Sequence, residues 1–184
     1  MGRPKTFSRQ GVLEKTLPVF WRHGYADTSL QEIEEATGVN KSGLYAEFEG
    51  KEDLFLQSLR YYLDAQEKKG LLTAAPLGWA NIARFLRLAP CNTDGQKGCF
   101  SVSSMRELAI LPPKAAALVA QSRTHLKHLL AKNIEVERTT MDPDAVADLV
   151  LTFFTGLSME HHLKQSRSSV LRRIDSFMMV VQSL

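Results

Sequence analysis

Cysteine is scarce in this chain, with only two among 184 residues, which argues against a disulfide-stapled extracellular fold. Residues 1–15 carry several basic side chains but lack the apolar core of a secretory signal. Apolar runs such as residues 149–151 are far too short to span a bilayer. We therefore expect a soluble cytoplasmic protein in a reducing compartment, without a membrane segment.

The chain also lacks the short motifs of common enzymes. It contains no G-x-S-x-G, no H-E-x-x-H and no glycine pattern of a dinucleotide-binding fold. Gly43 and Gly50 superficially resemble a P-loop, but six residues separate them where four are needed. His125 and His128 lie one helical turn apart without a cysteine or carboxylate cluster beside them. We expect no enzyme activity, no cofactor and no metal site.

Positive charge is present in only small excess. The formal net charge is +3, and residues 1–60 carry eight basic and nine acidic side chains, a balance of −1. An anionic partner would therefore have to be recognised through the position of the basic groups rather than through their total number. Arg3 and Lys5 lie in an N-terminal tail, and Lys41 and Lys51 stand at the starts of two predicted helices.

Helical periodicity dominates the sequence and predicts an all-α fold of about nine helices. We expect a kink at Pro18, a linker at residues 70–76 and a loop at residues 90–98. This pattern predicts a DNA-binding domain over residues 1–50, a connecting helix over residues 51–69 and a second helical domain over residues 70–184. The predicted helices cover residues 8–23, 29–37, 41–48, 51–69, 77–88, 99–111, 114–137, 142–165 and 168–184.

The most informative stretch is residues 29–48, which has the spacing of a helix-turn-helix. Two helices of about eight residues flank a short turn that contains Gly38. The second helix opens with polar and small residues, and this is where a recognition helix presents side chains to bases and phosphates. The predicted contacts there are Asn40, Lys41, Ser42, Gly43 and Tyr45.

The run from Thr28 through Thr37-Gly38-Val39-Asn40-Lys41-Ser42-Gly43-Leu44-Tyr45 to Lys51-Glu52-Asp53-Leu54-Phe55 resembles the DNA-binding domain of the TetR family of bacterial regulators. Residues 17–25, Leu-Pro-Val-Phe-Trp-Arg-His-Gly-Tyr, also resemble the end of the family's first helix. The resemblance is specific from residue 8 to about residue 56. It departs at Glu47, where family members often carry an aromatic residue.

That resemblance implies DNA contacts beyond the recognition helix. Thr28 or Ser29 would contact phosphate at the start of the second helix, and Lys51 would hold a phosphate from the next helix. Arg3 and Lys5 would follow the backbone or the minor groove. A carboxylate facing phosphate would weaken binding, so we expect Glu47 to point away from the DNA or to accept a hydrogen bond from a cytosine amino group.

The resemblance also implies a C-terminal ligand pocket in each subunit and a homodimer formed through the last two long helices. Two recognition helices about 34 Å apart are needed to read a palindromic operator, which independently favours a dimer. The apolar residues that we predict for the dimer interface, which could also be ordinary core, are Leu149, Phe153, Leu157, Val170, Ile174, Phe177 and Val181.

Two kinds of signal are compatible with the C-terminal half. Cys99 lies at the N-terminus of a predicted helix and close to Lys97, a setting that can make a thiol reactive, with Cys91 as a partner for its oxidised form. The alternative is a purely structural role for Cys99, as a small buried residue in tight helix packing. An apolar effector would instead need an aromatic lining, for which the candidates are Trp79, Phe85, Phe100, Met105 and Phe154.

Together these features predict a DNA-binding transcriptional regulator. By the resemblance it is a repressor that a small-molecule or redox signal releases from a palindromic operator, with the helix at residues 51–69 transmitting the shift. The alternative is a helical protein-interaction adaptor without operator binding. Steep salt dependence and a strong sequence preference would distinguish a regulator from an adaptor.

Overall fold

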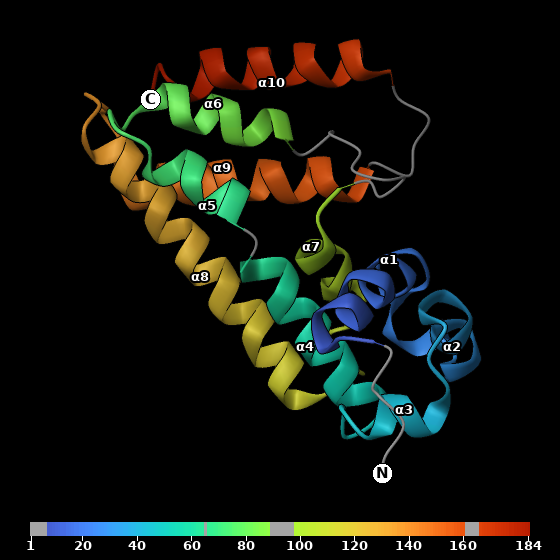
Figure 1. The fold of residues 1–184 in the computed structure, drawn as a ribbon. Coiled ribbons are helices and arrows are strands. Elements are labelled where there is room, and N and C mark those ends of the chain that lie inside the picture. The colour runs from blue at the N-terminus through green and yellow to red at the C-terminus, as the bar shows by residue number, and fades with distance from the viewer. Residues whose placement is uncertain (1–6, 65, 89–97, 161–165) are drawn as a thin grey trace. The chain divides into compact units, whose positions relative to one another are not determined.

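The computed structural model describes residues 7–64, 66–88, 98–160 and 166–184, with only the backbone of residues 66–69 and 88. Over these ranges the chain forms ten α-helices and one 3-10 helix and contains no strand (Figure 1). The predicted all-α class is confirmed. No helix within the described part of the chain is long and apolar enough to cross a membrane.

The chain divides into two compact units. Unit 1 holds residues 1–64 and 104–119, and unit 2 holds residues 65–103 and 120–184. The sequence-based division at residues 50 and 70 did not anticipate that residues 104–119 would join the N-terminal helices. The elements of unit 1 are α1 (Arg9–Asp27), α2 (Leu30–Thr37), α3 (Lys41–Tyr45), α4 (Lys51–Asp64), η1 (Met105–Glu107) and the first turns of α8 (Pro113–Glu135).

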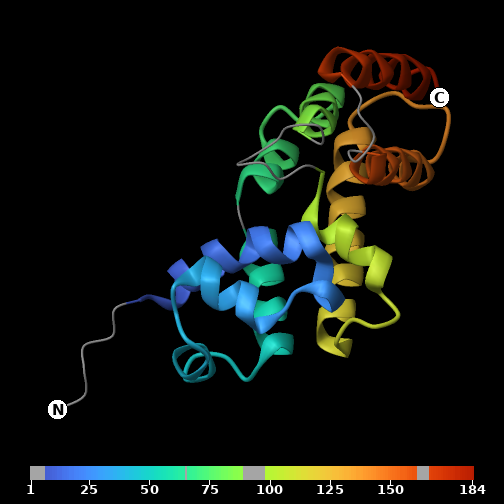
Figure 2. The same ribbon diagram turned by 90° about the vertical axis from the view of Figure 1, so that its right-hand side faces the viewer.

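In unit 1, α1 packs against both α2 and α4, and η1 also contacts α1 (Figure 2). The centre of this packing is aromatic, with Phe20 and Phe55 fully buried and Tyr25 partly buried. The ring of Phe20 on α1 meets that of Phe55 on α4 edge-on at 5.1 Å, and the Tyr25 ring lies 5.2 Å from Phe55. Burial of such side chains stabilises a fold by roughly 1.5–3 kcal/mol each, so this cluster supports the short helices α2 and α3.

The first helix, α1, is interrupted near its end by a glycine. The Ser8 side chain caps it by accepting a hydrogen bond from Gly11 N at 3.0 Å. Pro18 lies inside the helix, and the non-helical residue is Gly24, with φ 85° and ψ 180°. The predicted end of the regular helix at residue 23 is confirmed, and residues 25–27 form a further short turn beyond the irregular glycine. The backbone angles leave helical values at Gly24 and not at Pro18, where we expected a kink.

Unit 2 contains α5 (Gln66–Thr73), α6 (Trp79–Leu88), most of α7 (Phe100–Ser104), the remainder of α8, α9 (Pro143–Met159) and α10 (Arg167–Val181). In Figure 1, α6 and α9 both run alongside α10, and α10 contacts each of them. Two fully buried amides connect α6 to α8: Asn133 Oδ1 accepts from Asn81 Nδ2 at 3.0 Å and from Gly78 N at 3.0 Å. Paired in this way, the buried polar groups avoid a desolvation penalty.

Several predicted boundaries differ from those observed. The helix expected at residues 51–69 corresponds to α4 and the first part of α5, on either side of residue 65, which lies outside the described residues. Helix α5 runs through Thr73 into the stretch that we expected to be a linker. The helix expected at residues 99–111 is only α7 followed by η1. The predicted start of α9 is confirmed, with the Asp142 side chain accepting from Ala145 N at 3.1 Å. The loop predicted at residues 90–98 lies almost wholly outside the described residues.

Candidate nucleic-acid interface

The helix-turn-helix is built from two capped helices. Ser29 caps α2, with its side chain accepting from Glu32 N at 3.2 Å while the Glu32 carboxylate accepts from Ser29 N at 2.7 Å. Gly38 ends α2, and Asn40 then caps α3 by accepting from Gly43 N at 2.9 Å. Each cap side chain satisfies one of the free amides at its helix start, which favours a defined geometry for the turn between α2 and α3.

Helix α3 buries one side chain and exposes the residues around it. Leu44 is 1% exposed, whereas Tyr45 is 46% exposed and both Lys41 and Ser42 are exposed. The Lys41 ammonium lies 5.7 Å from the centroid of the Tyr45 ring, within reach of a cation–π contact. The exposed side of α3 therefore carries a cation, a hydroxyl and an aromatic ring, the groups that bind phosphates and base edges.

Gly43 has a packing role that its sequence position did not predict. A Cβ atom there would lie 2.8 Å from Val39 Cγ1, 3.2 Å from Asn40 Oδ1 and 3.3 Å from Phe7 Cε1. The small residue thus allows α3 to approach its own turn and the start of the chain. Close approach to a DNA groove remains a prediction for this position.

Thr28 does not offer its hydroxyl to DNA. It is 1% exposed, and its Oγ1 donates to the carbonyl of Gly24 at 2.6 Å. The expected phosphate contact at Thr28 is therefore corrected: the hydroxyl is turned inward to bind the backbone of α1. Ser29 is exposed, although its hydroxyl already donates to Glu32 Oε2 at 2.8 Å.

Lys51, at the start of α4, binds the end of α1. Its ammonium donates to the carbonyl of Ala26 at 3.0 Å and lies 4.9 Å from the centroid of the Tyr25 ring. Partial burial lowers the pKa of the Lys51 ammonium, and the nearby carboxylates, Glu107 foremost among them, act in the opposite direction. A phosphate bound here would have to share the ammonium with α1. The predicted contacts Arg3 and Lys5 lie outside the described residues.

Two contacts that sequence reasoning missed hold α3 in place. The Arg9 guanidinium lies 4.4 Å from the centroid of the Phe48 ring and donates to the carbonyl of Glu47. At the other end of α3, the amide of Lys41 donates to the Glu34 carboxylate. A helix of five residues has little stability of its own, so these contacts from α1 and α2 matter. No local motif could have revealed either of them.

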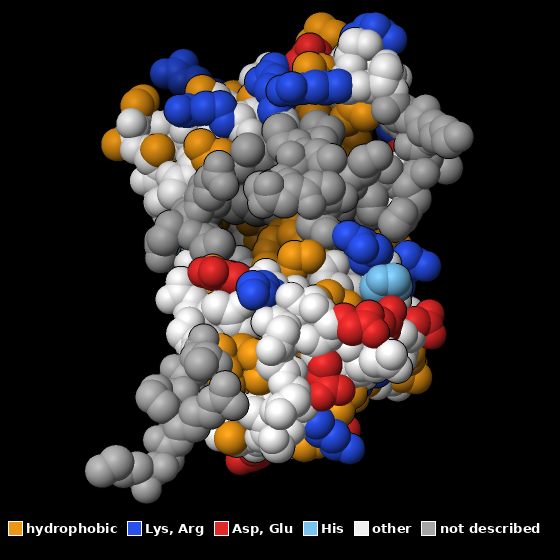
Figure 3. Space-filling view, turned by 45° about the vertical axis from the view of Figure 1, so that its right-hand side comes forward, with side chains coloured by type: hydrophobic (Ala, Val, Ile, Leu, Met, Phe, Trp, Pro, Cys, Tyr) orange, Lys and Arg blue, Asp and Glu red, His pale blue; other side chains and the backbone are white. Residues whose placement is uncertain are grey.

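Acidic side chains of unit 1 gather beside a histidine on the face shown in Figure 3. His23 is on α1 and Glu32 is in the first turn of α2, and His23 Nε2 lies 3.8 Å from Glu32 Oε1. Within residues 1–60, five of the nine acidic residues lie on α1 and α2, and the other four follow α3 or open α4. Helix α3 itself carries no acidic residue and exposes Lys41.

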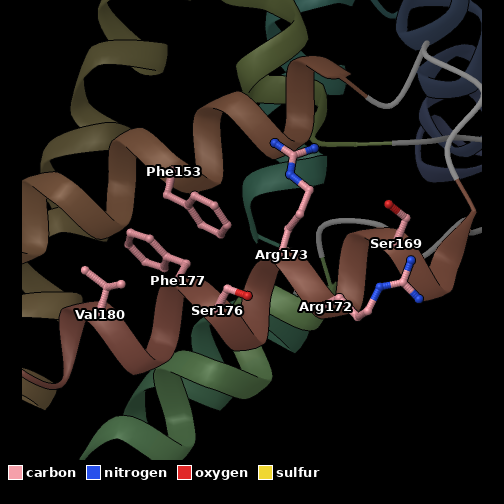
Figure 4. Close-up of a pocket in the computed structure, with 7 residues that line it drawn as sticks. All are labelled: Phe153, Ser169, Arg172, Arg173, Ser176, Phe177 and Val180. Atoms are coloured by element: carbon pink, nitrogen blue, oxygen red, sulfur yellow. The ribbon is translucent and has the colours of Figure 1, made fainter.

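In unit 2, helices α9 and α10 share an open apolar surface. The rings of Phe153 and Phe177 stack 3.9 Å apart at an interplanar angle of 5° (Figure 4). They line a pocket of about 580 Å³ together with Val180, Arg172 and Arg173. Of the apolar side chains on these two helices, Leu149 and Met159 of α9 are 44% and 39% exposed, and Val180 of α10 is 61% exposed.

The seven residues predicted for a dimer interface separate into two groups. Leu157, Ile174 and Val181 are buried within unit 2, with 7%, 0% and 1% exposure. A buried side chain has no surface to offer a second subunit, so these three are corrected from interface to core. The other four retain accessible surface: Leu149, Phe153, Val170 and Phe177.

Most residues predicted for a signal site belong to the core of unit 2. Phe85 and Phe154 are each 1% exposed with their ring centroids 4.6 Å apart, and Phe100 is also 1% exposed. Trp79 is half-buried, and Met105 belongs to unit 1, so it is not part of this cluster. Cys99 is 6% exposed at the start of α7, and Cys91 lies outside the described residues.

Comparison with known proteins identifies the helix-turn-helix. Residues 12–57 match the sequence profile described as "Bacterial regulatory proteins, tetR family". The HTH-type transcriptional repressor ComR of Escherichia coli (strain K12) is 39% identical over 114 residues, 59% of this chain and 54% of ComR. The repressor AcnR of Corynebacterium glutamicum is 39% identical over 59 residues, 32% of this chain and 31% of AcnR. The matched region thus spans at most about half the length of these relatives.

Solved structures extend the likeness over nearly the whole chain. A CifR variant with three cysteines replaced, complexed with 26-base-pair double-strand operator DNA, superposes with a TM-score of 0.83 at 25% identity, covering 97% of this chain and 98% of that one. Reduced NemR of E. coli shares the fold, with a TM-score of 0.78 at 16% identity over 91% of this chain and 95% of that one. Residues 12–57 thus have the sequence of a TetR-family DNA-binding domain, α2 and α3 form its helix-turn-helix, and the chain as a whole has the fold of TetR-family transcriptional regulators.

Proposed function

We propose that the protein is a cytoplasmic, homodimeric repressor that binds a palindromic operator through α3 and has no catalytic role. The observation that carries this proposal is the exposed side of α3, where Lys41, Ser42 and Tyr45 project from a helix that buries only Leu44. The related repressor ComR and the operator complex of CifR support the same function.

The chemistry of this surface suggests how the DNA would be read. Tyr45 combines an aromatic ring with a hydroxyl that can donate to a phosphate or accept from a base, and Lys41 supplies a mobile cation. Phosphate contacts set the register of the helix on the duplex, whereas base-edge contacts set the sequence preference. The caps at Ser29 and Asn40 keep α2 and α3 folded in the absence of DNA, which lowers the conformational entropy lost on binding.

The second subunit would cover the open surface of α9 and α10. Leu149, Phe153, Phe177 and Val180 form an exposed apolar area of the kind that monomeric surfaces usually avoid. A twofold dimer brings the same patch of both subunits together. TetR-family proteins are dimeric, and two copies of α3 would then reach successive major grooves about 34 Å apart.

The releasing signal would act in unit 2, and both predicted kinds of signal remain part of the proposal. The matched CifR structure is of a variant with cysteines replaced, and the NemR structure is of a reduced form. In this chain, however, the burial of Cys99 shields its thiol, so an apolar small molecule that enters the aromatic cluster around Phe85 and Phe154 is the stronger candidate. The two kinds of signal are distinguished by measuring which agent releases operator DNA. Release by the thiol oxidant diamide supports a redox signal, and release by an aromatic ligand from a panel supports a small-molecule effector.

The proposal is tested by operator binding of variants on α3. After selection of bound genomic fragments, dissociation constants are measured for Tyr45→Ala, Lys41→Ala and the control Lys114→Ala. Lys114 is also exposed in unit 1 and its replacement removes the same charge. We expect Tyr45→Ala to weaken specific binding by about 1–3 kcal/mol and Lys41→Ala to reduce the salt slope by about one.

The outcome separates a regulator from an adaptor. A repressor keeps wild-type helicity and dimerisation in all three variants but loses operator affinity only in the two α3 variants. An adaptor shows no sequence preference and no steep salt dependence, even in the wild type. Equal operator affinity for Tyr45→Ala and wild type would contradict the assignment of α3 as the recognition helix.

A further inference from the structure

A single carboxylate from the second half of the chain binds the junction between α1 and α2. Glu107 Oε2 accepts from Tyr25 N at 2.7 Å, and Glu107 Oε1 accepts from Ala26 N at 2.8 Å. Both amides follow Gly24, the residue with φ 85° that interrupts α1. One carboxylate thus satisfies two consecutive backbone donors next to the point where the helix is irregular.

Gly24 is shaped to admit this carboxylate. A Cβ atom at residue 24 would lie 2.5 Å from Glu107 Oε2 and 3.1 Å from Oε1. Its φ also falls in the region that side-chain-bearing residues rarely adopt. Glycine is therefore required at this position both by the backbone and by the approach of Glu107.

The junction bound by Glu107 controls the placement of two other helices. The Ala26 carbonyl accepts from the Lys51 ammonium at the start of α4, and the Gly24 carbonyl accepts from Thr28 Oγ1, one residue before the cap of α2. These polar contacts between the end of α1 and the starts of α2 and α4 all involve backbone groups within residues 24–28. A shift of this segment would move the beginning of the helix-turn-helix.

The segment that carries Glu107 enters unit 1 directly from unit 2. Residues 65–103 belong to unit 2, and residues 104–119 belong to unit 1. Glu107 ends η1, eight residues after the buried Cys99 and seven after the fully buried Phe100. Glu107 therefore comes from a segment about eighty residues away from α1 in the chain and still packs in the same unit as α1.

We infer that Glu107 is a positioning residue for the DNA-binding helices: by binding the amides of Tyr25 and Ala26, it sets the entry into α2. This inference rests on the proposed operator binding. It assigns the placement of the helix-turn-helix to two hydrogen bonds accepted by one carboxylate.

The test compares Glu107→Gln and Glu107→Ala with the control Glu35→Gln in the full-length protein. Glu35 is exposed on α2, and its replacement changes the net charge by the same amount. Dissociation constants are measured for the selected operator and for a scrambled duplex of equal length. We expect the ratio of specific to non-specific affinity to fall by about tenfold in both Glu107 variants, a typical coupling between sites, and to stay unchanged in the control.

Amide hydrogen exchange gives a second readout that does not require operator DNA. The amides of Tyr25 and Ala26 should exchange faster in Glu107→Gln than in wild type, while those in the middle of α4 keep their protection. Wild-type protein without any operator preference would refute the proposed function, although the exchange result could still hold. Wild-type preference together with an unchanged ratio and unchanged exchange in Glu107→Gln would overturn the inference and leave the proposed function intact.

Discussion

Replacing Gly43 with alanine places a methyl group at the tightest point beneath the recognition helix. The new Cβ would lie 2.8 Å from Val39 Cγ1, and Val39 is 6% exposed and branched at Cβ, so it has little freedom to withdraw. It would also lie 3.2 Å from Asn40 Oδ1, the atom that caps α3. Glycine at this position therefore relieves a steric conflict in the folded protein.

The expected magnitude follows from two opposing effects. Overpacking a well-filled site costs about 1–3 kcal/mol, whereas alanine gains about 0.5–1 kcal/mol over glycine inside a helix. We expect Gly43→Ala to lower the free energy of unfolding by about 1 kcal/mol. Gly70→Ala is the matched control, because Gly70 also lies within a helix but a Cβ atom added there would meet nothing within 4 Å; it should raise stability by about 0.5–1 kcal/mol.

The assay is urea denaturation at 25 °C, followed by far-UV circular dichroism and combined with operator titration of each variant. Opposite signs for the two substitutions would support packing as the role of Gly43. If Gly43→Ala is as stable as wild type or more so, and only operator affinity falls, the steric reasoning is refuted. The glycine would then serve the approach to DNA alone.

Two further predictions concern the subunit interface and the cap of α2. Val180→Asp should dissociate the dimer in sedimentation experiments, because burying an unpaired charge in the interface costs roughly several kcal/mol. The control Val136→Asp changes a residue of similar exposure just beyond α8 and should leave the dimer intact. A dimeric Val180→Asp protein would contradict the proposed interface. The Ser29 backbone amide, followed by its hydroxyl, lowers the pKa of Glu32 below its ordinary value of 4.5, so this cap stabilises α2 above that pH and is lost as acid protonates the carboxylate. Ser29→Ala should raise the pKa of Glu32 in a carbon-13 NMR titration, and an unchanged value would show that the hydroxyl plays no part.

Local sequence patterns predicted the helical class and the helix-turn-helix correctly. Ser8, Ser29 and Asp142 each cap a helix by binding an amide three residues further along the chain. The neighbouring residues in the sequence are therefore sufficient to identify such a cap. The exposed character of Lys41 and Tyr45 was likewise predictable, because both lie off the apolar stripe that contains Leu44. The family motif then added a function to these local signals.

Boundaries were predicted less well where tertiary packing outweighs local preference. The short turn of α1 after Gly24 is bound by Glu107, which accepts hydrogen bonds from the amides of Tyr25 and Ala26. The partition of residues 104–119 into unit 1 has the same origin. These contacts join residues about eighty positions apart in the chain, and no pattern within a window of a few turns contains both partners.

An apolar stripe determines that a helix has a face to bury, but it does not determine what covers that face. The spacing of Ile174, Phe177 and Val181 on α10 was therefore compatible with either core or interface. Only the folded chain decided between them, burying Ile174 and Val181 within the subunit while leaving Phe177 accessible beside Phe153. By itself the sequence determined the caps, the helical period and the recognition motif, because each acts over a few residues; which hydroxyls, carboxylates and apolar groups remained available for DNA or a partner was decided by packing between distant segments.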